Sequence, residues 1–142
     1  HISTLITNTD SCAPNPCQRA VVAGLQGPQD EVLKMVKTFR ERREVIVDGL
    51  NTLPGFTCLK PGGAFYVWPN VTAACKMVGA KDSEEFRKLL LHEAGVAVLA
   101  DIHFGPRVPD EGQHIRFSYA SSTEDIKDAI ERIRKWMAAK AK

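Results

Sequence analysis

The chain has 142 residues, of which 44% are hydrophobic and 25% charged, and its formal net charge is +2. These values are typical of one globular unit, and they favour neither nucleic acid nor an anionic membrane as a partner. No apolar run approaches the roughly 18 residues that a membrane-spanning helix needs. No signal peptide opens the chain, and its first residue is His1, which indicates a processed chain or a fragment.

The cysteines and histidines do not form a metal-binding pattern. No two cysteines form a CxxC pair, and no histidine stands at zinc-finger spacing from them. We therefore expect no metal site and free thiols in a reducing cytosol, with a disulfide pair as the alternative. The cysteines are Cys12, Cys17, Cys58 and Cys75.

The first third of the chain predicts helices after a short extended run. Residues 2–7 are rich in β-branched side chains and predict an extended segment, and prolines follow it. Pro16 suits the first turn of a helix over 17–25. From residue 29 to residue 53, apolar side chains recur every three or four residues, which predicts a helix of more than six turns that Pro54 and Gly55 end.

The middle of the chain predicts a hairpin and a second long helix. Residues 56–60 and 63–69 predict two strands joined at Pro61–Gly62, with Gly62 and Gly63 supplying positive φ angles. Residues 70–81 predict a loop or a short, poor helix. Asp82 and Glu85 have the spacing of a capping box that opens a helix, and Gly95 ends that helix.

The continuous apolar run at 96–100 predicts a buried strand, and residues 101–112 predict a long irregular loop. The last helix begins at a second capping box, Ser121 with Glu124, and buries Ile126, Ile130, Ile133 and Met137. Few strands mixed with helices favour an α+β fold, in which helices, one of them long, cover one face of a small, mainly antiparallel sheet.

Residues 113–121 alternate between apolar and polar side chains, which predicts a strand with one buried face. Ile115, Phe117 and Tyr119 would cover the core. Arg116 would project from the opposite face, where its guanidinium can bind a carboxylate or phosphate with two parallel hydrogen bonds. The alternative is a solvated arginine that pairs with a nearby acidic side chain.

Several stretches together resemble the C-terminal part of the class I/II aminotransferases, fold-type-I enzymes that depend on pyridoxal 5'-phosphate (PLP). The similarity covers nearly the whole chain and is strongest to bacterial and archaeal aspartate and aromatic aminotransferases. KPGGAFY and IRFSYA are fairly specific when they occur together. The stretches are QGPQD at 26–30, ERR at 41–43, LPGF at 53–56, KPGGAFYVWPN at 60–70, DSEEF at 82–86, EAGVAV at 93–98, FG at 104–105 and HIRFSYASS at 114–122.

The resemblance implies that this chain is part of a transaminase acting on amino acids and 2-oxo acids. Residues 1–27 would be the tail of a preceding large domain with a linking helix, and residues 28–142 the C-terminal small domain. In the family, the arginine at the position of Arg116 binds the α-carboxylate of the substrate. The family also implies a cytoplasmic homodimer in the full-length protein.

In the family, the lysine that holds PLP and the groups that contact the PLP ring lie before the region matched by this chain. We therefore expect no catalytic, cofactor-binding or metal-binding residue here, and no activity of the chain alone. None of the lysines stands in the family's lysine motif. They are Lys34, Lys37, Lys60, Lys76, Lys81, Lys88, Lys127, Lys135, Lys140 and Lys142.

The chain departs from the family pattern after EAGVAV. The family has a Pro-Gly turn there, whereas residues 100–103 are Ala, Asp, Ile and His. Arg107, in the charged loop that follows, is expected to be solvated, with a second anion contact as the alternative. Other fold-type-I enzymes, such as a carbon–sulfur lyase or a cyclopropane-forming synthase, also keep the carboxylate arginine. A non-enzymatic regulator domain is a further alternative, although no basic helix-turn-helix accompanies it.

Overall fold

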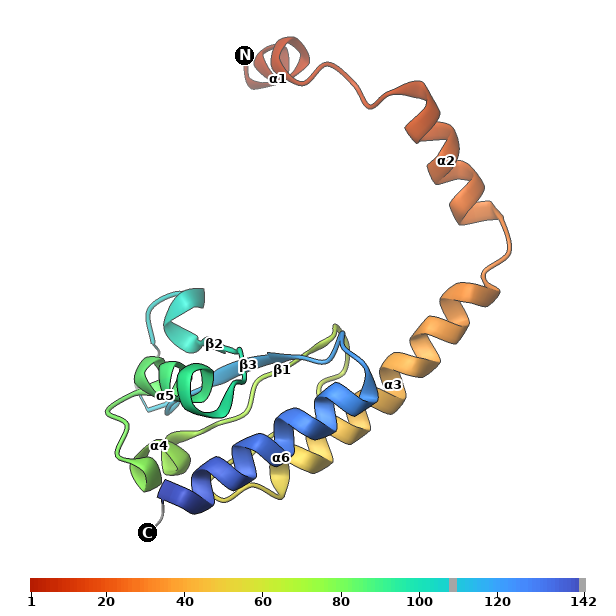
Figure 1. Ribbon diagram of the computed structural model, residues 1–142. Helices are drawn as coiled ribbons and strands as arrows, with labels where there is room; N and C mark the ends of the chain where they lie inside the picture. The colour runs from red at the N-terminus through yellow and green to blue at the C-terminus, as the bar shows by residue number, and fades with distance from the viewer. Residues whose placement is uncertain (108–109, 141–142) are drawn as a thin grey trace. The chain divides into compact units, whose positions relative to one another are not determined.

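The computed structural model describes residues 1–107 and 110–140, which fall into two compact units, His1–Met35 and Val36–Lys142 (Figure 1). The predicted loop at 101–112 therefore lies partly outside the described residues, at positions 108 and 109. The division expected between residues 27 and 28 refers to the domains of a larger enzyme, and it stays a prediction.

The first unit contains helices α1 (Ile2–Thr9), α2 (Asn15–Gln26) and the beginning of α3 (Asp30–Asn51). The expected helix with Pro16 in its first turn is confirmed. The extended segment expected over residues 2–7 is wrong. The Thr7 and Thr9 hydroxyls donate hydrogen bonds to carbonyls four residues earlier, at 2.9 Å and 3.0 Å. The hydroxyls therefore find partners within the helix itself, and no strand among the described residues pairs with this segment.

The second unit is built on a three-stranded antiparallel sheet. Its strands are β1 (Tyr66–Val67), β2 (Leu99–Ala100) and β3 (Ile115–Ser118), and β3 lies between the other two (Figure 1). The helices are the rest of α3, α4 (Thr72–Val78), α5 (Ser83–Leu89) with a π-helical turn η1 (Leu90–Ala94), and α6 (Thr123–Lys140). A 3-10 turn η2 (Asp101–Phe104) follows β2. The α+β fold expected from the sequence is confirmed.

The predicted hairpin is wrong. Among the described residues, Thr57 of the first segment bridges Asn70, which follows the second segment, and β1 pairs with β3 instead. The Asn51 side chain donates to the Cys58 carbonyl at 2.9 Å and accepts from the Cys58 amide at 2.8 Å. Since α3 thereby satisfies the groups of Cys58, no second strand is needed beside it. Neither glycine of the expected turn has a positive φ, but Ala64 does, at 60°.

The strand predicted over residues 96–100 is shorter and less buried than expected. Only Leu99 and Ala100 are in β2, and burial alternates: Val96, Val98 and Ala100 are buried, whereas Leu99 is 37% exposed. An edge strand with one face on the core gives this alternation, and a strand covered on both faces would not.

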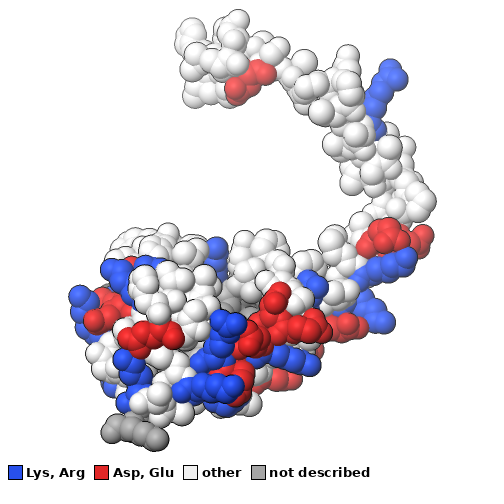
Figure 2. Space-filling model, in the orientation of Figure 1, with Lys and Arg blue, Asp and Glu red and all other residues white. Residues whose placement is uncertain are grey.

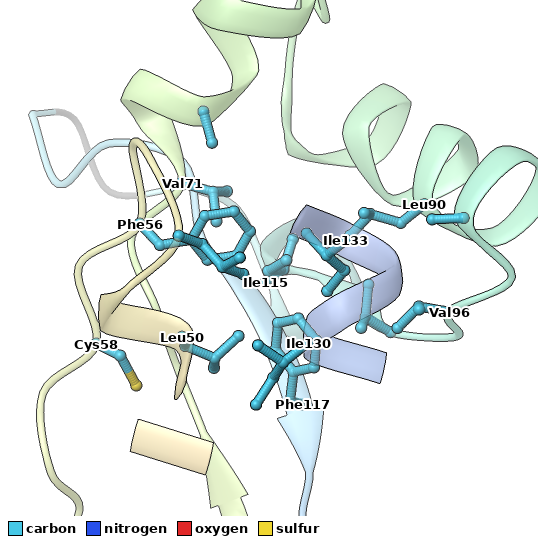
Figure 3. Packing of buried hydrophobic residues seen from close by; sticks show 14 of the residues in the cluster. Leu50, Phe56, Cys58, Val71, Leu90, Val96, Ile115, Phe117, Ile130 and Ile133 are labelled. Carbon is cyan, nitrogen blue, oxygen red and sulfur yellow. The ribbon is translucent and has the colours of Figure 1, made fainter. Parts of the chain in front are cut away.

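One hydrophobic core joins the inner face of the sheet to the helices of the second unit (Figure 3). Ile115, Phe117 and Tyr119 are buried, which confirms the inward half of the alternation predicted for β3. The apolar stripe of α3 is buried only from Ile46 onward, while Val36 is exposed. The buried hydrophobic side chains of the described helical segments are Ile46, Val47, Leu50, Ala74, Cys75, Phe86, Leu90, Ala94, Ile126, Ile130, Ile133, Trp136 and Met137.

Side-chain capping sets the start of α5 and α6. The Glu85 amide donates to Asp82 Oδ1 at 2.8 Å, as expected, but the Glu85 carboxylate accepts from the Lys81 amide and not from Asp82. The cap predicted at Ser121 is wrong by one residue: the Asp125 amide donates to Ser122 Oγ at 3.0 Å. The η1 turn ends at Gly95, whose φ of 67° favours glycine.

The cap at Asp82 predicts a measurable loss of stability when it is removed. We expect Asp82→Ala to lower the free energy of unfolding by about 1 kcal/mol, because the Glu85 amide loses its acceptor. Urea unfolding of wild type and variant measures the difference. Asp128→Ala, inside α6, should cost less, and an equal loss in both variants would contradict a capping role.

Charged side chains of both signs are interspersed over the face of the second unit seen in Figure 2. Several form ion pairs along helices, such as Arg132 with Asp128 at 2.7 Å. Among the described residues, no helix combines the length and apolar character needed to cross a bilayer. The predicted absence of nucleic-acid and membrane partners stays a prediction.

Candidate functional site

The outer face of the sheet carries Arg116. Because residues on one strand alternate, His114, Arg116 and Ser118 share the face opposite the core. The register places Leu99 across from Arg116, and Tyr66 across from Ser118. Residues directly opposite each other lie on the same face, so β1 and β2 both place side chains beside the arginine. Arg116 is partly exposed, as predicted.

Two aromatic rings lie against the guanidinium of Arg116. Its central carbon is 4.1 Å from the ring centre of Tyr66 and 4.5 Å from that of Phe104. Such cation–π contacts fix the plane of the guanidinium without using its N–H groups. Among the described residues, no side-chain hydrogen bond or ion pair engages these N–H groups. Within this part of the chain, the acidic partner expected in the alternative interpretation is not found beside Arg116.

A shallow pocket of about 190 Å³ adjoins the arginine. Further aromatic rings lie next to Phe104. The rings of Trp68 and Phe104 meet edge to face with their centres 5.2 Å apart, and Trp68 stacks on His114 with a distance of 5.9 Å between ring centres. The residues lining the pocket are Ala97, Val98, Leu99, Arg116 and Ser118. The arrangement presents an oriented donor fork beside apolar surface, which suits a small organic carboxylate.

Asp101 joins the segment after β2 to the rest of the fold. Its Oδ1 accepts hydrogen bonds from the Ser83 hydroxyl at 2.6 Å and from Arg107 Nε at 2.9 Å, and its Oδ2 accepts from the His114 amide at 3.0 Å. Burial acts to raise the pKa of Asp101, but these donors outweigh it and hold the pKa below its usual value. The carboxylate therefore stays ionised.

The structure adds specific partners to the expectation for Arg107. Its side chain is 31% exposed and pairs with Asp101, and Nη2 donates to Ser83 Oγ at 2.7 Å. The guanidinium is thus held by groups of the chain itself. Arg107 is exposed, as expected for a loop arginine, but it also pairs with Asp101, a contact that the sequence did not predict.

The fold and this site can be compared with known proteins. Residues 4–133 match the family model described as aminotransferase class I and II. The chain belongs to this aminotransferase family. It is 39% identical over 140 residues to the aspartate aminotransferase of Geobacillus stearothermophilus, a match covering 99% of this chain and 34% of the relative. The chain therefore spans about a third of that relative's length.

Solved structures agree with the family assignment. The aspartate aminotransferase of Rhizobium meliloti has a TM-score of 0.83 at 31% identity, over 95% of this chain and 34% of that one. The aromatic aminotransferase of Pyrococcus horikoshii has a TM-score of 0.82 at 29% identity, over 96% and 35%. The resemblance to class I/II aminotransferases stated from the sequence motifs is confirmed.

PLP is the cofactor that the aminotransferase family implies, and a lysine anchors it covalently. The described lysines do not fit this role, because none lines the pocket beside Arg116, and Lys60 and Lys140 pair with surface carboxylates at 2.6 Å and 2.9 Å. Among the described residues, no three metal-ligating side chains form a cluster either. We assign no reaction step to a lysine of this chain.

Neither Cys58 nor Cys75 lines the pocket beside Arg116. Cys12 and Cys17 are exposed, Cys58 and Cys75 are buried, and all are free. Burial raises the pKa of Cys58 and Cys75 to about 11, so neither is a ready nucleophile.

Sequence reasoning found Arg116 but missed its neighbours. Tyr66 and Phe104 both lie in motifs that carry the resemblance, yet their contact with Arg116 depends on the strand order. In the sequence, Asp101 stands out only as a departure from the family pattern. The one local signal for its role is a carboxylate directly after a strand, which is too common to be specific.

Proposed function

We propose that this chain is the C-terminal part of a PLP-dependent aminotransferase, which exchanges an amino group between an amino acid and a 2-oxo acid. The single observation that supports this role best is the guanidinium of Arg116, which lies against two aromatic rings with its N–H groups unengaged among the described residues. Residues 1–27 would belong to the large domain and residues 28–142 to the small domain. A cytoplasmic homodimer is part of the same proposal.

In this proposal, Arg116 binds the α-carboxylate that amino acids and 2-oxo acids share. Two parallel charge-assisted hydrogen bonds hold this group in one orientation, which also fixes the direction of the neighbouring carbon. Tyr66 and Phe104 keep the guanidinium plane in place and exclude water from its faces. PLP, when bound by the rest of the enzyme, supplies the electron sink for chemistry at that carbon.

Product analysis of the full-length enzyme tests the proposal. Incubation with PLP, an amino acid and a 2-oxo acid should yield the matching new amino acid and new 2-oxo acid in equal amounts. Release of ammonia and a thiol from a sulfur-containing amino acid, without paired transfer, would instead indicate a carbon–sulfur lyase. No turnover with any amino acid, together with specific DNA binding, would indicate a regulator.

The 142-residue chain by itself should not take up PLP covalently, because none of its lysines stands in the family's lysine motif. After mixing and desalting, we expect no absorbance band near the visible edge and no single-site mass shift on borohydride reduction. The full-length enzyme is the positive control. A stable, stoichiometric adduct on one lysine of the isolated chain would refute this prediction.

A further inference from the structure

The segment from Asp101 to Arg107 is fixed at both ends by one polar cluster. Asp101 stands directly after β2, and the side chain of Arg107 returns to it with an Nε–Oδ1 distance of 2.9 Å. Both side chains also bond to the hydroxyl of Ser83, which is fully buried at the start of α5. We call Asp101, Arg107 and Ser83 the latch.

Two further hydrogen bonds connect the latch to the residues that precede β3. The Ser83 amide donates to Gln113 Oε1 at 2.8 Å, and the His114 amide donates to Asp101 Oδ2. Gln113 and His114 immediately precede β3, the strand that carries Arg116. The latch therefore connects the segment 101–107 to the base of the same strand that holds the proposed carboxylate site.

Between the two ends of the latched segment, Phe104 lies over the guanidinium of Arg116. Gly105 follows it with a φ of 129°, a conformation that other residues rarely adopt, and this turn allows the chain to run back toward Arg107. The ring of Phe104 is half exposed and also meets Trp68. Its position thus depends on where residues 101–107 are anchored, since no core packing holds it.

We propose that the latch positions Phe104 on Arg116 and thereby sets the affinity of the site for substrate carboxylate. This inference rests on the proposed function. Asp101 and Arg107 act as positioning residues: they touch neither substrate nor cofactor, and they act through Phe104. The chain uses a carboxylate anchored to a buried serine at the place where the family pattern has a Pro-Gly turn.

The test compares binding of 2-oxo acids to full-length PLP enzyme by calorimetry, with pyruvate, 2-oxoglutarate and phenylpyruvate as probes. For the probe that wild type binds most tightly, we expect Asp101→Asn to raise the dissociation constant about five- to tenfold, the cost of losing roughly one oriented hydrogen bond. Arg107→Gln should have a similar effect. The matched control is Asp128→Asn, which breaks a 2.7 Å ion pair on α6 and should leave binding unchanged.

A double variant separates positioning from general damage. If Asp101 acts through Phe104, Asp101→Asn combined with Phe104→Leu should bind no more weakly than Phe104→Leu alone. Labelling with 5-fluorotryptophan gives a second measurement: the fluorine resonance of Trp68 should shift in Asp101→Asn, whereas that of buried Trp136 should not. Additive losses, or an unchanged Trp68 resonance, would overturn the inference.

The outcomes distinguish this inference from the function on which it rests. If Arg116→Lys weakens 2-oxo acid binding but the latch variants bind as wild type does, only the latch inference fails. If Arg116→Lys itself leaves binding unchanged, the proposed carboxylate site fails, and the role given to the latch fails with it.

Discussion

Replacing Arg116 with lysine in the full-length enzyme is expected to slow the half-reaction with an amino acid. The activation free energy should rise by about 2–4 kcal/mol, the amount expected when one contact to the transition state is lost. Lysine keeps the positive charge but loses the planar fork, whose N–H groups donate to both carboxylate oxygens in one orientation. It also loses the stacking on Tyr66 and Phe104. Single-turnover kinetics with amino acid, and titration with 2-oxo acid, measure the loss of rate and of affinity.

The control for this prediction is an amine substrate without a carboxylate. Such an amine gains nothing from Arg116, so its slow reaction should hardly change in Arg116→Lys. PLP should stay bound with its normal absorbance, because the cofactor is held by other parts of the enzyme in the proposed function. Equal slowing of both substrates, or an unaffected amino acid, would make Arg116 a structural residue.

The largest effect on stability is expected at Phe86. Its side chain is fully buried on α5. Its ring packs against the rings of Phe56 and Trp136, with distances between ring centres of 5.9 Å and 5.7 Å. Phe86→Ala removes these contacts and leaves a cavity, which should cost about 3–5 kcal/mol. The free energy of unfolding of a small domain is about 5–15 kcal/mol in total, so the variant should unfold at a much lower urea concentration. Urea unfolding followed by circular dichroism measures the shift.

A neighbouring exposed leucine provides the matched control for Phe86→Ala. Leu91 lies in the turn that continues α5 and is 40% exposed. Leu91→Ala removes a similar kind of side chain without opening a cavity in the core, and it should change the free energy of unfolding by less than about 1 kcal/mol. If both variants lost the same amount, the loss would come from helix propensity and not from the core.

The sequence alone was sufficient to predict those features that interactions between residues close in the chain determine. The alternation over residues 113–119 placed Ile115 and Phe117 inward and Arg116 outward, because side chains on a strand point to opposite faces. The cap at Asp82 and the end at Gly95 were readable for the same reason, since capping bonds join residues three or four positions apart. The family motifs added the candidate role of Arg116.

The tertiary structure decided everything that depends on which distant segments meet. The sequence could not show that β1 pairs with β3, because the groups that would have completed a hairpin are satisfied by Asn51, a residue on α3. Nor could it place the rings of Tyr66 and Phe104 against Arg116. These contacts join residues 12 to 50 positions apart along the chain. No periodicity encodes such a pairing, since it results from strand order and register, which the packing of the whole unit determines.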